Sequence, residues 1–303
     1  DEERAVRETA RALGYSESIS FSLMAARDAR QFSAREPVRV ANPVSEAAGV
    51  LRTSGVPGML GAVEWNLNRG ARAVRLFEIG KLYLEVEDGG RYQEPPVLAL
   101  AATGPATEPS PHAPARDLGF FDLKGDVETL LDLFECRQRY FDSATVVDYY
   151  HPGRSARVAL DGETVALFGE IHPRIAAARK WRQPVLVAEF FLDRLWRRGL
   201  RRPRYEPLPR VPAVDRDLSL LVPEGVSFEQ VAETARGLGI PALADLQPVE
   251  IFRGGPVAGG QYSLLLRLVF QRAEQTLSDA EVNGWSRAIA AALLEKLNIA
   301  QRT

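Results

Sequence analysis

The last third of the chain switches between two hydrophobic periods in an order that few folds can accommodate. Near its start, Leu218, Leu220 and Val222 alternate with the polar residues Asp217 and Ser219. A period of two places the apolar side chains on one face of a β-strand and the polar ones on the other. We therefore expect a strand here with one buried face.

Two helices are expected in the same region, each with a recognisable first turn. Ser227 is followed three residues later by Gln230, and Ser278 is followed at the same distance by Glu281. This spacing is that of a capping box, in which each side chain binds the other residue's backbone N–H. Apolar residues at helical spacing follow both boxes, so each is expected to begin an amphipathic helix.

Two further strand patterns, at 248–255 and 261–271, are separated by a glycine-rich turn, and residues 299–303 can supply a last strand. The expected order is therefore strand, helix, strand, strand, helix, strand. This order is typical of the ferredoxin-like split βαβ domain, with both helices on one face of the sheet.

Residues 199–214 contain four prolines and a glycine, which disfavour both a helix and a central strand. We interpret this stretch as a linker and expect two domains, 1–204 and 205–303. In the first domain, strand patterns joined by hairpins alternate with helical patterns, and Asp161-Gly162 favours a two-residue hairpin turn. The first domain is therefore expected to be α+β, with an antiparallel sheet and flanking helices.

The chain lacks the usual sequence signatures of catalysis. Its three histidines are isolated, and no P-loop, GxGxxG unit or GxSxG elbow occurs. We therefore predict no catalytic and no metal-binding residues. The single cysteine, Cys136, excludes an internal disulfide framework and is typical of a reducing cytoplasm. No apolar run approaches the roughly 20 residues that a membrane-spanning helix needs, so no membrane association is expected.

Charge argues against general coating of a nucleic acid. The net charge of the chain is −2, and residues 205–303 hold nine Lys and Arg against twelve Asp and Glu. Residues 194–204 are different, because they contain six arginines and no acid. This run is typical either of a solvated linker or helix end, or of a segment that contacts phosphates, and both interpretations stay open.

Several longer segments resemble one known family, in the order in which that family has them. These are NPVSEAAGVLRTSGVPGMLGAVEWNLNRGARAVRLFEIGKLY (42–83), FFDLKGDVETLL (120–131), HPGRSA (151–156), FGEIHP (168–173), VPAVDRDLSLLV (211–222) and LRLVFQRAEQTLSDAEVN (266–283). They are similar to the C-terminal part of the beta subunit of bacterial phenylalanyl-tRNA synthetases. The resemblance implies a class II synthetase-like domain that has lost its chemistry, followed by a ferredoxin-fold anticodon-binding domain.

The resemblance also explains why the first domain carries no catalytic signature. A working class II core binds ATP phosphates through an arginine in its second motif and a glycine-rich third motif ending in arginine. Here Arg75 is expected to precede a strand that contains Glu78, and no glycine-rich element precedes Arg194. A lone arginine without close glycine backbone is poorly suited to a triphosphate. Arg52 is accordingly interpreted as a structural ion-pair or partner contact.

The family further implies which molecules the chain meets. We expect no cofactor in this chain, ATP and magnesium in the complete enzyme, and a cytoplasmic assembly of two alpha and two beta subunits that ligates phenylalanine to its tRNA. Trp65, Leu67 and Leu76 are candidates for the surface that faces the alpha subunit, with core burial as the alternative. Six residues are candidate contacts to the tRNA: Arg210, Arg216, Ser219, Phe252, Arg253 and Arg267.

Two alternatives remain from the sequence. The chain could be an assembly module whose last domain touches no RNA, or a self-contained adenylate-forming enzyme. The missing phosphate-binding arginines and glycines argue against the enzyme. Phe252 is equally compatible with stacking on a base and with core packing.

Overall fold

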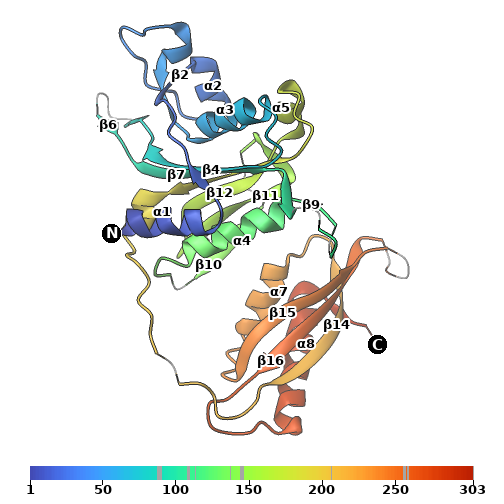
Figure 1. The fold of residues 1–303 in the computed structure, drawn as a ribbon. Coiled ribbons are helices and arrows are strands. Elements are labelled where there is room, and N and C mark those ends of the chain that lie inside the picture. The colour runs from blue at the N-terminus through green and yellow to red at the C-terminus, as the bar shows by residue number, and fades with distance from the viewer. Residues whose placement is uncertain are drawn as a thin grey trace. The chain divides into compact units, whose positions relative to one another are not determined.

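The computed structural model describes residues 1–86, 91–107, 110–112, 114–136, 138–143, 147–205, 207–254, 257 and 259–302 (Figure 1). The chain divides into two compact units, Asp1–Pro203 and Arg204–Thr303. No described helix is both long enough and apolar enough to cross a bilayer.

The first unit is built on a seven-stranded sheet. Its spatial order is β1 (Ser16–Glu17), β4 (Val74–Lys81), β7 (Pro96–Thr103), β13 (Val185–Phe191), β12 (Glu163–Ile171), β11 (Tyr150–Leu160) and β10 (Arg139–Asp142). All neighbours are antiparallel except β1 and β4, which are parallel. The predicted antiparallel sheet is therefore confirmed, apart from its β1 edge.

Helices and short ladders surround this sheet. The helices are α1 (Glu2–Ala12), α2 (Ala26–Gln31), η1 (Glu46–Ala48), α3 (Val56–Leu67), α4 (Phe120–Leu131), α5 (Pro173–Ala178) and α6 (Leu192–Trp196). The ladders are β2 (Leu23–Met24) with β3 (Val50–Leu51), β5 (Leu84–Glu85) with β6 (Tyr92–Gln93), and β8 (Pro105–Thr107) with β9 (Arg116–Asp117).

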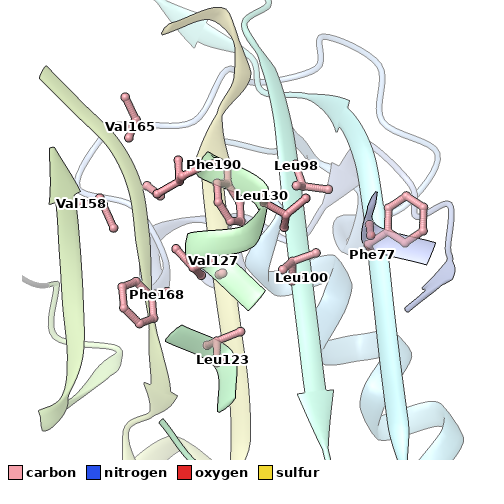
Figure 2. Close-up of a cluster of buried hydrophobic side chains, with 14 of the residues drawn as sticks. Phe77, Leu98, Leu100, Leu123, Val127, Leu130, Val158, Val165, Phe168 and Phe190 are labelled. Atoms are coloured by element: carbon pink, nitrogen blue, oxygen red, sulfur yellow. The ribbon is translucent and has the colours of Figure 1, made fainter. Parts of the chain in front are cut away.

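Both faces of the sheet are buried, each under its own helices. On one face, residues of α1, α4 and α6 form one buried cluster with the even-numbered residues of β7. Figure 2 shows Leu123, Val127 and Leu130 of α4 among Leu100, Phe168 and Phe190 of the sheet. On the other face, α3 and α5 pack on Ala99 and its neighbours. A central strand buried on both faces reads as a continuous apolar run, as the sequence of β7 does.

Two local expectations for the first unit differ from the structure, and a third is confirmed. The alternating apolar residues of 17–24 predict a single strand, but the structure has two short ones, β1 and β2, with Ile19 and Phe21 exposed between them. Arg75 lies inside β4 rather than before it. The hairpin is confirmed, since Asp161 and Gly162 both have the positive φ angles, 48° and 84°, that such a turn requires.

The second unit contains β14 (Val214–Pro223), α7 (Phe228–Arg236), β15 (Leu243–Phe252), β16 (Gln261–Phe270), α8 (Asp279–Leu297) and β17 (Ala300–Gln301). Its sheet has the order β15-β16-β14-β17 and is antiparallel throughout. The predicted βαββαβ order is confirmed, and both capping boxes form as expected. Residues 255, 256 and 258 of the glycine-rich turn and residue 303 of the tail lie outside the described residues.

One face of this second sheet carries the core and the other faces away from the helices. Leu218 and Leu220 of β14 are buried with Leu264 and Leu266 of β16 in a cluster that includes residues of α7 and α8. The odd-numbered residues of both strands point to the opposite side, which we call the open face. Figure 1 shows α7 and α8 on the same side of these strands.

Candidate nucleic-acid interface

The register of the sheet determines which predicted contact residues share the open face. Asp217 pairs with Arg267, Ser219 pairs with Leu265, and Ser263 pairs with Phe252 on the edge strand β15. Directly paired residues of an antiparallel ladder point to the same side. Ser219, Phe252 and Arg267 therefore lie together on the open face.

Arg267 is not free on this face. Its Nε and Nη2 atoms donate to the two carboxylate oxygens of Asp217 at 2.8 and 2.9 Å, a two-pronged pairing. The hydrogen bond from Arg267 holds the pKa of Asp217 below its usual value. Both side chains are 38% exposed, so water and ligands reach the pair. An RNA group can bind the Arg267 guanidinium only by displacing Asp217 or by sharing the guanidinium with it.

Arg216 lies on the opposite side of the sheet. It occupies an even-numbered position of β14, like buried Leu218, and belongs to the strand rather than to its approach. Its guanidinium donates to Asp279 at 2.6 Å and to Asn283 at 3.1 Å, both in α8. Arg216 therefore links β14 to the first turns of α8 and is not brought together with Arg267.

Phe252 and Ser219 differ in how far each side chain is exposed on the open face. Phe252 is 45% exposed at the end of the edge strand, so it is not a core residue in this unit. Ser219 is half-buried, and its backbone carbonyl accepts from the Arg302 N–H. A partly exposed ring on an open sheet face is a suitable platform for a base.

The last two predicted contacts lie beyond the strand ends. Arg210 is exposed before β14, where its backbone N–H donates to the Ala273 carbonyl. The Arg253 guanidinium carbon lies 4.8 Å from the centre of the Tyr262 ring, a cation–π contact that leaves its outer edge accessible. Both arginines are therefore outside the open-face cluster of Ser219, Phe252 and Arg267.

The open face carries more acid than the sequence analysis anticipated. By the same pairing rule the strands β14, β15 and β16 place Asp215, Asp217, Asp245 and Glu250 on it, together with the cation Arg267. Next to Phe252 the face has Ser263 and Leu265 on the neighbouring strand, and Glu250 lies opposite Leu265. The alternation of β14 is enough to put Asp217 on the polar face and Arg216 on the other one, whereas the cross-strand pairing could not be read from sequence.

The first unit has a polar centre of a different kind, buried beneath the sheet. Arg52 donates from Nη1 to Glu78 at 2.6 Å and to Ser20 at 3.1 Å, and from Nε to the Lys81 carbonyl at 2.8 Å. The Arg52 and Glu78 side chains are only 4% and 5% exposed. The interpretation of Arg52 as a structural ion-pair residue therefore agrees with the contacts.

A second buried carboxylate, Glu189 of β13, lies near the start of α3. One of its oxygens accepts from the Gly55 N–H at 2.6 Å and from the Ser54 hydroxyl at 3.0 Å. Burial raises the pKa of Glu189, and these two donors oppose the rise. Glu189 thereby satisfies a free N–H at the beginning of α3.

These residues do not fit a nucleoside triphosphate. The cation Arg52 is bound by Glu78, and a Cβ at Gly80 would lie 2.0 Å from an Arg52 nitrogen, so the guanidinium fills this space. Arg75 donates to the Leu13 carbonyl, and Arg194 donates to the Thr164 carbonyl. Among the described residues there is also no cluster of three metal-ligating side chains.

The arginine-rich run separates into two parts. Arg197 binds Glu163 at 2.8 Å and Arg198 binds Asp161 at 2.5 Å, so both arginines brace the β11–β12 hairpin. Arg201, Arg202 and Arg204 are exposed and form no side-chain ion pair within the described part of the chain. Only the second part is available for phosphates.

Comparison with known families gives the class of protein first. Residues 1–192 match the model described as phenylalanyl tRNA synthetase beta chain CLM domain, and residues 209–302 match the ferredoxin-fold anticodon binding domain. A synthetase domain joined to an anticodon-binding domain defines an aminoacyl-tRNA synthetase subunit. Since the first model covers more than half of the chain, the chain belongs to the phenylalanyl-tRNA synthetase beta chain family, which confirms the resemblance found in the sequence.

Individual relatives agree with this. The phenylalanine–tRNA ligase beta subunit of Moorella thermoacetica is 33% identical over 99% of this chain and 38% of its own length. The beta subunit of Ralstonia nicotianae is 34% identical over 90% of this chain and 35% of its own length. The chain thus spans less than two fifths of these relatives. Among solved structures, Desulfitobacterium hafniense PylSc, a pyrrolysyl-tRNA synthetase, matches with a TM-score of 0.48 and 16% identity, over 64% of each chain.

Proposed function

We propose that the second unit binds the anticodon region of phenylalanine tRNA, and that the chain contributes in this way to the ATP-dependent attachment of phenylalanine to that tRNA. The match of residues 209–302 to an anticodon-binding domain carries the proposal. The open sheet face, with Phe252, Ser219 and Arg267 on adjacent strands, supports it.

The charge of this face determines the kind of binding. With four acids around Arg267, general attraction to the phosphate backbone is weak, so recognition relies on stacking and on a few hydrogen bonds. Phe252 provides the ring, and Arg267 provides donors to a base edge once Asp217 yields its place. Arg210 and Arg253, at the strand ends, would then contact the RNA backbone.

A matched pair of variants tests this function. The full chain is titrated with an anticodon stem-loop of phenylalanine tRNA and with one whose anticodon is changed. Phe252→Ala should weaken binding of the first by about 1–3 kcal/mol, the range for one stacked base. Ile251→Ala is the control, because Ile251 is 53% exposed on the same strand but pairs with Leu264 on the helix-covered side. Equal affinity of both variants would favour an assembly module without RNA contact.

We also propose that the first unit is a non-catalytic scaffold. The buried cation Arg52 is paired with the buried carboxylate Glu78. The second buried carboxylate, Glu189, accepts from the Gly55 backbone N–H. These charged groups are therefore already bound within the unit. Calorimetric titration of the chain with ATP and magnesium should therefore give no saturable heat. Micromolar binding that disappears in Arg75→Ala or Arg194→Ala would contradict the scaffold role and favour an adenylate-forming enzyme.

The scaffold requires a partner, which we propose is the alpha subunit in an assembly of two alpha and two beta chains. Ile19, Phe21 and Val44 are large, exposed apolar side chains on two loops that lead into the β2–β3 ladder. Exposed apolar side chains of this size mark interaction surfaces when they gather. Of the candidates from sequence, Leu67 and Leu76 pack on the core. Trp65 is exposed, and the guanidinium carbon of Arg69 lies 3.6 Å from the centre of its ring.

Co-purification with the alpha subunit tests this surface. Phe21→Ser combined with Val44→Ser should reduce the amount of complex, because two apolar contacts are lost. Leu208→Ser is the control, since Leu208 is an exposed apolar residue outside the first unit. Undiminished complex formation by the double variant would exclude these loops from the interface.

A further inference from the structure

A surface pocket of about 710 Å³ lies in the first unit, between the end of α3 and the segment that joins α5 to β13. Its lining includes four cationic side chains, Arg72, Arg179, Lys180 and Arg182, and one carboxylate, Glu64. None of these cations takes part in the buried polar centre around Arg52. The concentration of positive charge in a hollow therefore requires its own explanation.

The carboxylate does not neutralise the pocket. Glu64 accepts a hydrogen bond from Arg179 at 2.7 Å, so its negative charge is paired with that arginine. Arg72, Lys180 and Arg182 are exposed and form no ion pair within the described residues. Three like charges around one hollow repel each other, and the repulsion is relieved when an anion enters.

Completion of the helix ends does not account for all of these cations. Cations near a helix C-terminus are favourable, but the effect is confined to the last turn. That need is met in α3 by Arg69, which donates to the Trp65 carbonyl at 3.1 Å. Arg72 and Arg182 lie beyond the last turns of α3 and α5, so the helix ends do not explain them.

Lys180 occupies a position where the backbone favours glycine. It directly follows Arg179, the C-cap of α5, and has a φ of 57°, in the left-handed region. Its N–H donates to the Ala177 carbonyl, and that of Trp181 donates to the Ala176 carbonyl. A side chain at such a position costs free energy relative to glycine. The cost is offset if the ammonium group at the pocket rim has a ligand.

The shape and donors of the pocket determine the class of anion. A small free phosphate is usually held by backbone N–H groups at a helix N-terminus, whereas α3 and α5 both end here. Long side chains spaced around an open hollow suit phosphates that are themselves spaced along a chain. We propose that this pocket binds the phosphate backbone of an RNA, as a contact separate from the open face of the second unit.

Binding of the full chain to a short RNA hairpin that lacks any anticodon sequence tests the proposal. The variant Arg72→Gln/Arg182→Gln should lower affinity about tenfold and make the slope of log K against log salt shallower by about 1.5. The control Arg11→Gln/Arg35→Gln removes the same charge at exposed arginines of the first unit that have no ion pair within its described residues. Arg72→Lys/Arg182→Lys should retain most of the affinity, since it keeps the charge.

A second measurement locates the RNA. A hairpin containing 4-thiouridine should cross-link to the peptide around Trp181, which lines the pocket. The proposal is overturned if both glutamine pairs lose equal affinity, if cross-links fall elsewhere, or if polyglutamate displaces the hairpin at matched charge, which would indicate an acidic protein partner. Failure of anticodon recognition is a separate outcome, because Phe252→Ala would leave hairpin binding unchanged.

Discussion

Two arginine–carboxylate pairs, one in each unit of the chain, differ in their surroundings. Arg52 and Glu78 in the first unit are 4% and 5% exposed, and Ser20 and the Lys81 carbonyl complete their hydrogen bonds. Arg267 and Asp217 in the second unit are each 38% exposed, with only each other as hydrogen-bond partners among the side chains described. Both pairs join a guanidinium to a carboxylate, but solvent reaches only the second pair to a substantial extent.

Exposure decides what each pair can do. A buried pair that is separated leaves an uncompensated charge in a medium that solvates it poorly, so it is fixed in place. An exposed pair contributes little to stability and exchanges its partner readily. We therefore interpret the first pair as part of the scaffold and the second as a contact that a ligand can open.

The largest expected effect is on the buried pair. Arg52→Met should lower the free energy of unfolding by about 3–5 kcal/mol, because Glu78 then stays buried without its cation. Urea denaturation followed by circular dichroism measures this loss.

The double variant Arg52→Met/Glu78→Leu separates charge from packing. Since neither charge remains, it should recover a large part of the lost stability. If Arg52→Met alone costs less than about 1 kcal/mol, the size expected for an exposed pair, then burial does not distinguish the two pairs.

The sequence predicts the elements of this chain better than its pairings. The capping boxes at Ser227 and Ser278 and the alternation of β14 depend on nearby residues, so the βαββαβ order could be derived from sequence. The pairing of Asp217 with Arg267 depends on the register of two strands fifty residues apart, which no local pattern encodes.

The errors in the first unit have a similar origin. Ile19 and Phe21 are apolar residues at alternate positions, a pattern that predicts a strand, yet both are exposed between β1 and β2. Exposed apolar side chains at alternate positions cannot be told from core residues by period alone. The ion pair of Arg52 could be anticipated as a role, whereas Glu78 as its partner could not.

The exposed pair is expected to matter for RNA rather than for stability. Arg267→Ala should weaken binding of the phenylalanine anticodon stem-loop by about 1–3 kcal/mol if the contact is a two-pronged one. Its free energy of unfolding should change by less than about 1 kcal/mol. Fluorescence anisotropy of a labelled stem-loop and urea denaturation measure the two quantities separately.

Arg216→Ala is the matched comparison within the same domain. Because its guanidinium binds Asp279 and Asn283 of α8, we expect a smaller effect on RNA than for Arg267→Ala. An equal loss of affinity would mean that RNA also approaches the helix side of β14, and the open face would then not be the whole interface.

The pH dependence of stability distinguishes the buried Glu189 of the first unit from the exposed Asp217. Burial raises the pKa of Glu189 above its value in the unfolded chain. Its contribution to stability is therefore greatest below the unfolded pKa and is lost as pH rises through the folded pKa. Glu189→Gln keeps the acceptor oxygen for Ser54 and Gly55, so the variant should gain stability relative to the parent as pH rises above about 4.5. Denaturation midpoints at several pH values measure this, and a constant difference would contradict it.

The smallest expected effect tests whether the exposed pair really opens. In Asp217→Asn the carboxylate that holds Arg267 loses its charge, so the guanidinium should transfer to RNA more easily. Affinity for the stem-loop should rise about 1.4- to fivefold, which corresponds to the roughly 0.2–1 kcal/mol range of exposed ion pairs. Asp215→Asn changes the same charge on the same face, but no hydrogen bond to Arg267 is lost. If both variants bind equally well, the gain comes from the reduced negative charge of the face. A gain confined to Asp217→Asn would mean that Asp217 restrains Arg267 until the RNA replaces it.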